Sequence, residues 1–557
     1  MLRVEKLRVG LPCGSDRACA VEDVSFEIMP GRTLCLVGES GSGKSVTGQA
    51  IAGLQPKALH ELTSGSIKLD GVELRTLSER QWQSVRGRQI GMVFQEPMVA
   101  LNPIMPIGRQ IAEMLRAHGP TLGRKEIRDR IHGLLQRVGI NDPRRIANSY
   151  SFQISGGQRQ RVMIACAVAH KPKLLIADEP TTALDVTTQA QVLDLLADLQ
   201  QETGMSMLFV THDFGIVAEI ATDIAVMQAG RIVEYGPKAD VLHVPREKYT
   251  RELLDAVPCL QACRHCAGER PAPLIELCEV CKTYHVDEGF LKRRALAALD
   301  EVSFSVCKGE VVALVGESGS GKSTIAKCLT RLTPVAKGMI RLEGVDLLSL
   351  RGRELKEARR RIQIVFQDPY GSLDPRQKVI EAVAAGPIAH DVPRKQAFEE
   401  AAELLSLVGL NSSVLYRFPH EFSGGQRQRI GIARALAVKP DLLIADEAVS
   451  ALDVTVQAQV LKLLADLQQR LGLTMLFITH DLRIAGQVSD RIVVLRNGAI
   501  VETGPTEEVF ANPCNAYTRN LLNAIPGLQL LKTERGAERD DQARRTRQSV
   551  TSLASSE

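Results

Sequence analysis

An eight-residue segment, GESGSGKS, occurs twice in the chain, each time after a short apolar run. Glycines let backbone N–H groups turn inward around phosphate oxygens, and the N-terminus of a following helix adds a favourable dipole. The pattern therefore predicts two phosphate-binding loops, each with a lysine that reaches the β- and γ-phosphates of a nucleotide. The predicted nucleotide contacts are Gly38, Glu39, Ser40, Gly41, Ser42, Gly43, Lys44, Ser45 and Val46, and Gly316, Glu317, Ser318, Gly319, Ser320, Gly321, Lys322, Ser323 and Thr324.

Hydroxyl, carboxylate and amide groups near these loops predict a magnesium site in each half. Another apolar run, LLIADE, occurs at 174–179 and at 442–447. Its aspartate is expected to hold Mg²⁺ through water, and the last serine of the loop to bind the ion directly. A glutamine that ends a further apolar strand in each half can ligate the metal's water shell and sense the γ-phosphate. The predicted magnesium set is Ser45, Gln95 and Asp178 in one half, and Ser323, Gln367 and Asp446 in the other.

Glu179 and Glu447 come one step after the magnesium aspartates. A carboxylate at this place can accept the proton of an attacking water, so each is the general-base candidate of its half. A histidine follows the next apolar run in each half, as His212 and His480 within Thr-His-Asp. A lone histidine at a strand end is usually structural, and although the duplicated order is specific, spacing alone leaves a structural role and a catalytic role equally open.

These residues require a particular arrangement of elements. The apolar runs Leu34–Val37, 174–178 and Met207–Val210 are separated by helical segments, and Val311–Val315 begins the same series again. Short buried strands that alternate with helices predict an α/β domain around a largely parallel sheet. The polar residues fall at the carboxyl ends of the strands, where open α/β sheets bind ligands.

The repeated motifs lie too far apart for a solenoid, so they indicate a whole domain present twice. We predict a first domain at 1–258, a Cys- and Pro-containing linker at 259–273, a second domain at 274–531 and a disordered tail at 532–557. The tail is charged and polar without periodicity, which is typical of disorder.

Composition limits the class of protein. The chain has 557 residues with 44% hydrophobic and 24% charged residues, which fits a globular protein of several domains. A net charge of +4 and 4% aromatic residues give little support for nucleic-acid binding. We expect no membrane span, no secretory signal and reduced cytosolic thiols among the 12 cysteines.

The linker contains Cys259, Cys263 and Cys266, a density that fits a [4Fe–4S] cluster or a zinc site. Cys278 and Cys281 follow in the expected first strand of the second domain. Their odd spacing should place them on opposite faces of that strand, so both cannot easily join one metal site. Reduced thiols without a metal are therefore the favoured interpretation.

Together these motifs resemble those of the ATP-binding cassette (ABC) ATPases, over nearly all of both halves. The most specific resemblance is SGGQRQR, which looks like the family's signature motif and occurs in both halves. The resemblance implies that each ATP, with Mg²⁺, lies between the phosphate loop of one half and the signature of the other. It also implies a switch role for the histidines, and D-loop roles for Asp185 and Asp453. The signature residues are Ser155, Gly156, Gly157 and Gln158, and Ser423, Gly424, Gly425 and Gln426.

Within that family the chain resembles the cassettes of importers for oligopeptides, dipeptides, glutathione and nickel. The segments that carry this resemblance include MVFQEPMVALNP, ADEPTTALDV, IVFQDPYGSLDPRQ and the pair YTRELLDAVP and YTRNLLNAIP. It implies an ATPase that drives transport of short peptides, with two separate transmembrane permeases and an extracytoplasmic binding protein as partners. The implied location is the cytoplasmic face of the cell (inner) membrane, peripheral through the permeases. The alternative, a soluble tandem ABC ATPase acting on ribosomes or DNA, is disfavoured by the short linker and the near-neutral charge.

The two halves depart from the family pattern in different places. Residues 149–154 read SYSFQI where the group tends to have a Pro-His-Glu run, and Ala448 replaces the usual proline after the second glutamate. Tyr284 matches the aromatic residue on which the family often stacks adenine. The first half offers only Val9 nearby, which leaves base stacking there open.

Overall fold

The described residues divide into two compact units, the first built mainly of Met1–Leu184 and Thr188–Val257, the second mainly of Pro258–Ile525. No helix in the described part of the chain is both long and apolar enough to cross a membrane. The computed structural model describes residues 1–12, 17–118, 123–182, 184–258, 272–287, 293–368, 371–450 and 452–527. The predicted tail at 532–557 lies outside these residues, and so does most of the predicted linker.

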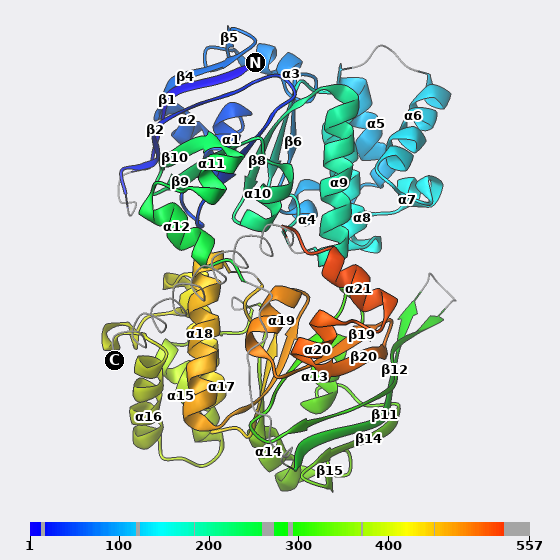
Figure 1. Ribbon diagram of the computed structural model, residues 1–557, viewed down its shortest axis with the longest axis vertical. Helices are drawn as coiled ribbons and strands as arrows, with labels where there is room; N and C mark the ends of the chain where they lie inside the picture. The colour runs from blue at the N-terminus through cyan, green and yellow to red at the C-terminus, as the bar shows by residue number, and fades with distance from the viewer. Residues whose placement is uncertain are drawn as a thin grey trace, which may run out of the picture. The chain divides into compact units, whose positions relative to one another are not determined.

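The first unit is organised around a largely parallel sheet with the strand order β10-β9-β3-β8-β7-β6 (Figure 1). Every neighbouring pair is parallel except β9 and β10, which are antiparallel. The phosphate loop follows β3, and the predicted acidic pair ends β7. The strands are β3 (Thr33–Val37), β6 (Ile90–Val93), β7 (Leu174–Asp178), β8 (Ser206–Thr211), β9 (Asp223–Gln228) and β10 (Arg231–Pro237).

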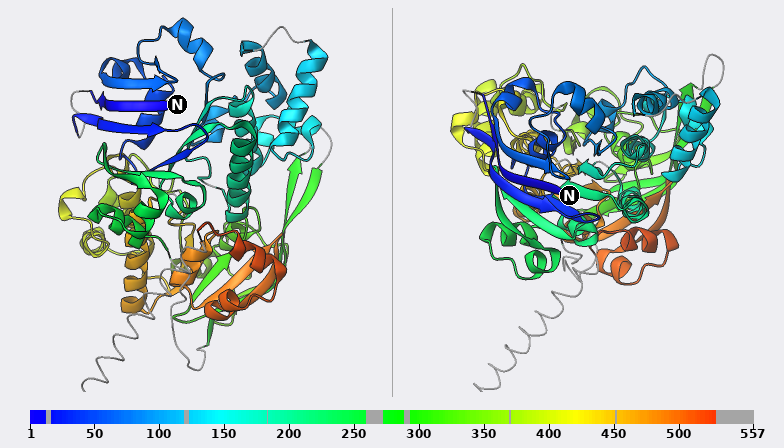
Figure 2. Two further views of the ribbon diagram at one scale, coloured as in Figure 1. Left: turned by 45° about the horizontal axis from the view of Figure 1, so that its top comes forward. Right: turned by 90° about the horizontal axis from the view of Figure 1, so that it is seen from above.

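A second, antiparallel sheet in the same unit has the order β2-β1-β4-β5, which the sequence analysis did not predict. It joins the start of the chain to a segment that follows the first helix. In both pictures its strands β1, β2 and β4 lie at the opposite end of the unit from helices α5, α6 and α7 (Figure 2). The strands are β1 (Leu2–Gly10), β2 (Cys19–Ile28), β4 (Thr63–Leu69) and β5 (Val72–Glu73).

The two faces of the parallel sheet belong to different cores, as the alternation of side chains along a strand requires. Leu34 and Leu36 of β3 pack with the antiparallel sheet and helix α1. Cys35 and Val37 face the helices on the other side, among them α8 and α9. Because both faces are covered, the strand is apolar from Leu34 to Val37, as buried parallel strands are. The helices are α1 (Lys44–Ile51), α2 (Lys57–Glu61), α3 (Glu79–Val85), α4 (Pro97–Ala100), α5 (Ile107–His118), α6 (Arg124–Arg137), α7 (Pro143–Asn148), α8 (Gly156–Val168), α9 (Val186–Thr203), α10 (Phe214–Ile220), α11 (Lys238–His243) and α12 (Lys248–Asp255), with the 3₁₀ turn η1 (Ser151–Gln153).

The second unit repeats this plan, with sheet orders β16-β17-β18-β13-β19-β20 and β12-β11-β14-β15. Its parallel sheet has the same strand sequence as that of the first unit, read from the opposite edge. The strands are β11 (Pro273–Asp287), β12 (Arg293–Cys307), β13 (Val311–Val315), β14 (Lys337–Leu342), β15 (Val345–Asp346), β16 (Ile362–Val365), β17 (Leu442–Asp446), β18 (Thr474–Thr479), β19 (Arg491–Arg496) and β20 (Ala499–Pro505). The helices are α13 (Lys322–Leu329), α14 (Gly352–Arg361), α15 (Val379–Ala389), α16 (Arg394–Leu407), α17 (Gly424–Leu436), α18 (Val454–Leu471), α19 (Leu482–Val488), α20 (Thr506–Ala511) and α21 (Ala516–Asn523), with 3₁₀ turns η2 (Ser412–Val414) and η3 (Pro419–Glu421).

A β-bulge in β11 overturns the expectation that Cys278 and Cys281 point to opposite faces. The register shifts between these two residues, and Glu279 at the bulge has a φ of 49°. Leu277 and Val280 are therefore both buried in the core, although an odd spacing separates them. Because a bulge adds one residue and reverses the alternation, the two cysteines both lie on the side away from that core. The prediction that Cys278 and Cys281 point to opposite faces of the strand is therefore wrong.

Candidate functional site

The first phosphate loop connects β3 to α1 at the carboxyl edge of the parallel sheet. Gly38 and Gly43 have φ angles of 153° and 104°, in the region that favours glycine. A Cβ atom on Gly38 would lie 2.2 Å from the carbonyl oxygen of Met227, and one on Gly43 would lie 2.6 Å from that of Ala20. These glycines are therefore required both by backbone conformation and by space.

The loop lysines are buried and bridge their own loops. Lys44 is 5% exposed, and its Nζ donates to the carbonyl oxygens of Gly38 and Glu39 at 2.7 and 2.8 Å. Lys322 makes the same pair of bonds within its own loop at 2.7 and 2.8 Å. Burial lowers the pKa of Lys322, although nearby carboxylates oppose the shift. An ammonium group in this position can exchange carbonyl contacts for phosphate oxygens.

Other groups of the loop also fit a bound phosphate. The hydroxyl of Ser42 is buried and has no hydrogen-bond partner among the described residues. A buried polar atom without a partner is costly unless a ligand or water satisfies it. Gly41 and Gly319 have φ angles of 74° and 81°, and a Cβ on either would meet no atom within 4 Å. The loop therefore combines an unsatisfied donor with an open side.

In each unit the serine and the aspartate of the predicted magnesium set contact each other, whereas the glutamine contacts the neighbouring glutamate. Ser45 donates its hydroxyl to Asp178 Oδ1 at 2.9 Å, and Ser323 donates to Asp446 Oδ1 at 3.0 Å. Burial raises the pKa of both aspartates, with a contribution from the neighbouring glutamate. A buried carboxylate whose charge is poorly compensated is suited to a cation, and hydroxyl and carboxylate oxygens are the ligand types that Mg²⁺ takes. The residues present therefore fit a magnesium ion.

Glu179 is held from several sides at the end of β7. Its φ of 45° is unusual for a residue other than glycine, and its backbone N–H donates to Val210. The amide of Gln95 donates to Oε2 at 2.9 Å, and the hydroxyl of Thr182 donates to the same oxygen at 3.0 Å. His212 Nδ1 lies 3.2 Å from Oε1. The geometry fixes both oxygens of a side chain that is 11% exposed.

The electrostatics of this cluster keep the glutamate ionised. Burial alone would raise the pKa of Glu179, but the hydrogen bond and charge of His212 outweigh it. Lys44 and Thr182 act in the same direction, so that the pKa falls to about 2. The group is an anion at neutral pH and can accept a proton.

The second unit repeats most of this cluster. Glu447 has a φ of 47°, and Gln367 donates to its Oε2 at 2.7 Å. His480 Nδ1 lies 3.5 Å from Oε1. Burial opposes ionisation, but His480 and Lys322 lower the pKa of Glu447 overall. Ser450 takes the place of Thr182, and its hydroxyl donates to the carbonyl oxygen of Glu447 at 3.0 Å.

The signature residues begin helix α8 in the first unit and the equivalent helix α17 in the second. Ser155 caps α8 by accepting from the N–H of Gln158, which in turn accepts from the N–H of Ser155. These bonds stay within the cap, so within its own unit the signature is not brought into the cluster around the phosphate loop. A Cβ on Gly157 would lie 2.6 Å from Cγ2 of Thr188 in α9. The second unit has the same cap at Ser423.

The departure SYSFQI leaves the local structure unchanged. In the first unit Gln153 accepts from the N–H of Tyr150 at 2.9 Å across η1. In the second unit Glu421 accepts from the N–H of Phe418 at 2.7 Å across η3. An amide and a carboxylate close the same turn before the signature.

Val9 is not the counterpart of Tyr284. It is fully buried in the core, where it cannot meet a nucleotide. Lys6 and Glu279 are the equivalent bulge residues of β1 and β11, with φ angles of 48° and 49°. Counting from them, Leu11 occupies the place of Tyr284.

Two tyrosines that the sequence analysis did not assign reach the phosphate loops. The hydroxyl of Tyr249 in α12 accepts from the N–H of Glu39 at 3.2 Å. The hydroxyl of Tyr517 in α21 accepts from the N–H of Glu317, also at 3.2 Å. Both belong to the YTR segments, so the repeated tyrosine was the available signal.

The remaining predicted residues are the two D-loop aspartates and the linker cysteines. Asp185 and Asp453 directly precede α9 and α18. Cys259, Cys263 and Cys266 lie outside the described residues. Within the described ranges no group of three or more potential metal-ligating side chains of the His, Cys, Asp and Glu type occurs.

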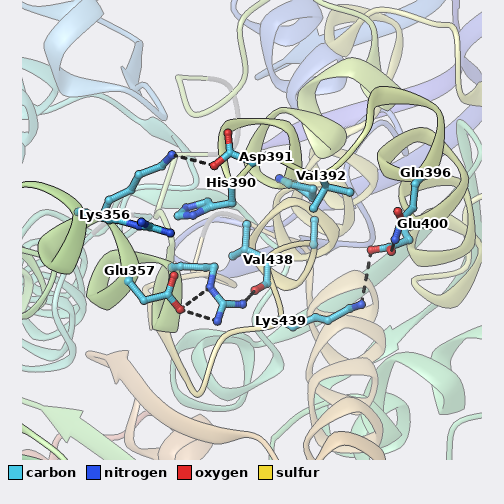
Figure 3. A pocket seen from close by; sticks show the side chains of 13 residues that line it. Lys356, Glu357, His390, Asp391, Val392, Gln396, Glu400, Val438 and Lys439 are labelled. Carbon is cyan, nitrogen blue, oxygen red and sulfur yellow. Dashed lines mark hydrogen bonds and ion pairs between the residues drawn. The ribbon is translucent and has the colours of Figure 1, made fainter.

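A cavity of about 530 Å³ in the second unit lies between α14, α15, α16 and the end of α17 (Figure 3). Several of its charged side chains form ion pairs, including Lys356 with Asp391 and Lys439 with Glu400. None of the predicted site residues lines it. The cavity is therefore separate from the phosphate loop and from the cluster around Glu447.

Comparison with known families agrees with this geometry. A family model described as ABC transporter matches residues 21–182 and 299–450. The chain belongs to the ABC transporter family. It is an ATPase of that family, which binds ATP and Mg²⁺. A further model, described as the oligopeptide/dipeptide transporter C-terminal region, matches 233–282 and 501–550.

Individual relatives of this ABC chain cover it almost completely. The peptidoglycan transport ATP-binding protein YejF of Agrobacterium fabrum is 46% identical over 96% of this chain and 98% of its own length. The glutathione import ATP-binding protein GsiA of Pectobacterium atrosepticum is 42% identical over 94% of this chain and 89% of its own length. The protein of the same name from Escherichia coli O157:H7 is 44% identical over the same shares.

Proposed function

We propose that this ABC ATPase is the motor of an importer for short peptides, including glutathione. The strongest support is that each half matches two family models. One is the ABC transporter model and the other is the oligopeptide/dipeptide transporter C-terminal region. The names of the relatives, which refer to peptidoglycan transport and glutathione import, agree with this substrate class.

The residues divide the work of hydrolysis. Bound ATP supplies the phosphoanhydride bond, and Mg²⁺ neutralises charge on its phosphates. The loop lysines bind the phosphates, while Glu179 and Glu447 orient an attacking water and accept its proton. The glutamines and histidines hold these carboxylates in place. Following the family resemblance, we assign the signature serines and glycines to the γ-phosphate of the nucleotide bound by the other half.

The domains and partners follow from the same proposal. We assign one cassette to 1–258 and another to 274–531, joined by the linker at 259–273. Two separate permeases would receive the motion, and an extracytoplasmic protein would deliver the peptide. The chain would then lie at the cytoplasmic face of the cell membrane, held there by the permeases.

Reconstitution tests this function directly. The full chain is combined with its permeases and binding protein in lipid vesicles, and uptake of labelled dipeptides, oligopeptides and glutathione is measured with and without ATP. The control is Glu179→Gln with Glu447→Gln, which should bind ATP but hydrolyse it at least about a hundredfold more slowly, as loss of a general base predicts. We expect ATP-dependent uptake in vesicles that contain the wild-type chain and none in vesicles that contain the double variant.

Two results would contradict the proposal. Hydrolysis at wild-type rate in the double variant would remove the general-base assignment. Active ATP turnover without uptake of any of these solutes would remove the substrate class, and co-sedimentation with ribosomes or DNA would then favour the alternative.

A further inference from the structure

We infer that Tyr249 and Tyr517 are positioning residues of the two ATP sites, through which the C-terminal region of each half holds its phosphate loop ready for nucleotide. This inference deepens the proposed function, on whose loop assignment it rests. The tyrosines lie far along the chain from the loops that they contact. Nothing in the hydrolysis chemistry itself requires them.

The contact is the same in both units. Each tyrosine hydroxyl accepts the N–H of the loop's second residue, Glu39 or Glu317, at 3.2 Å. Tyr517 is 6% exposed, and burial raises its pKa to about 12, so it remains a neutral phenol at physiological pH. A neutral phenol oxygen is a suitable acceptor for a backbone amide. Two independent copies of one geometry argue against an accidental approach.

The helices that carry the tyrosines are themselves anchored. In the first unit, Glu234 of β10 accepts from the N–H groups of Arg246 and Glu247 at 2.8 and 3.4 Å. The guanidinium of Arg251 donates to the carbonyl oxygen of Arg246 at 3.1 Å. The helix α12 therefore projects Tyr249 from a start that is fixed to the sheet.

The second unit is anchored in the same way. Glu502 of β20 accepts from the N–H groups of Cys514 and Asn515 at 2.7 and 3.2 Å. Arg519 donates to the carbonyl oxygen of Cys514 at 3.4 Å. The first and third residues of YTR thus have separate tasks, because the tyrosine contacts the phosphate loop and the arginine fixes the helix start.

The bond matters because the loop must hold several N–H dipoles pointing inward before any phosphate neutralises them. Such an arrangement is strained by mutual repulsion, and an external acceptor on one amide reduces the number of conformations that the loop samples. Preorganisation of a binding loop increases affinity by reducing the ordering cost of binding. Loss of the tyrosine hydrogen bond should therefore lower the affinity for ATP and leave the rate of the chemical step unchanged.

The test compares the wild-type full chain with the double variant Tyr249→Phe, Tyr517→Phe, which removes only the hydroxyls. The dissociation constant for N-methylanthraniloyl-ATP and the KM for ATP should each rise about fivefold, the effect of one neutral hydrogen bond. The kcat should stay within about twofold, since uniform binding is lost. Without nucleotide, hydrogen–deuterium exchange should be faster in peptides covering 38–45 and 316–323.

Matched controls separate this role from general destabilisation. Tyr235→Phe with Tyr416→Phe removes two hydroxyls from exposed tyrosines, one in each unit, that do not contact a phosphate loop. This variant should match the wild type in affinity and loop exchange. The midpoint of thermal unfolding should be similar in all three proteins.

Three outcomes would overturn the inference. These are unchanged loop exchange in the double variant, unchanged ATP affinity, and a fall in kcat with KM unaltered. A wild-type chain that binds no ATP would instead refute the proposed function. In that case the exchange comparison, made without nucleotide, would still decide whether the tyrosines hold the loops.

Discussion

Thr182 donates its hydroxyl to the carboxylate of Glu179, whereas Ser450, at the corresponding place in the second unit, donates to the backbone carbonyl of Glu447. The backbone turns are otherwise alike, because the N–H of each residue donates to the carbonyl oxygen of its glutamate at 3.2 Å. The two general-base candidates therefore have different numbers of side-chain partners. The difference predicts that the two clusters respond unequally to matched substitutions.

Thr182→Val should lower kcat for ATP hydrolysis by about fivefold without a change in KM. Valine keeps the branched shape and removes only a hydroxyl worth about 1 kcal/mol in orienting the carboxylate. Thr182→Ser should restore most of the rate, because it returns the donor. Steady-state kinetics of the full chain provide the measurement.

Ser450→Ala is the matched variant for the second unit. Its hydroxyl contacts a carbonyl oxygen and not the carboxylate, so kcat should fall by less than about twofold. Equal losses in Thr182→Val and Ser450→Ala would show that the carboxylate contact has no particular effect on the rate.

Tyr284→Leu should weaken ATP binding at the second phosphate loop by roughly fivefold or more, since base stacking on an aromatic ring is worth about 1–3 kcal/mol. The substitution reproduces Leu11, the residue at the same place in the first unit. Titration in a Lys44→Ala background reports mainly the second loop. Tyr235→Leu is the control, and unchanged affinity in Tyr284→Leu would remove the stacking role.

The parallel sheets and the clusters at their edges could be predicted from the sequence because their determinants are local. An apolar run buried on both faces, as in β3, and a Gly-rich loop before Lys44 are visible in a few consecutive residues. The structure accordingly places the glutamate, glutamine and histidine of each half in one cluster, as at Glu179.

The remainder depends on pairing between distant segments. In the antiparallel sheet, β1 pairs with β4, although the phosphate loop lies between these two strands in the sequence. No local periodicity indicates a pairing between segments so far apart. The bulge at Glu279 carries no glycine, because a non-glycine residue adopts the positive φ, and its trace in the sequence is the change of apolar spacing from two residues to three between Leu277 and Val280. The bond from Glu39 to Tyr249 connects residues that only the folded unit brings together.

Gly157→Ala should destabilise the first unit by about 1–3 kcal/mol, the usual cost of overpacking. The new Cβ would lie 2.6 Å from Cγ2 of Thr188, whose branched side chain has little rotamer freedom in a helix. Gly156→Ala is the control, because the nearest atom there, Nη2 of Arg159, lies at an ordinary contact distance of 3.8 Å. Thermal unfolding without nucleotide should show a lower midpoint only for Gly157→Ala, and equal midpoints would contradict the close packing of α8 on α9.

Glu343→Gln should lower the thermal stability of the chain at neutral pH by about 1 kcal/mol or less, as for a partly exposed ion-pair network. Glu343 accepts from Lys308 at 2.5 Å and from Arg361 at 2.6 Å. The hydrogen bond from Lys308, followed by that from Arg361, lowers the pKa of Glu343 from its ordinary value of 4.5.

Because the folded state has the lower pKa, the stabilising contribution of Glu343 is fully present above pH 4.5 and is lost as the pH falls through the folded value. The difference in unfolding midpoint between wild type and Glu343→Gln should therefore be constant near neutrality and shrink under acidic conditions. Glu399→Gln, at an exposed position of α16, serves as the control and should show no such trend. A midpoint difference that grew as the pH fell would mean that Glu343 favours folding in its protonated form, contrary to the ion pairs with Lys308 and Arg361.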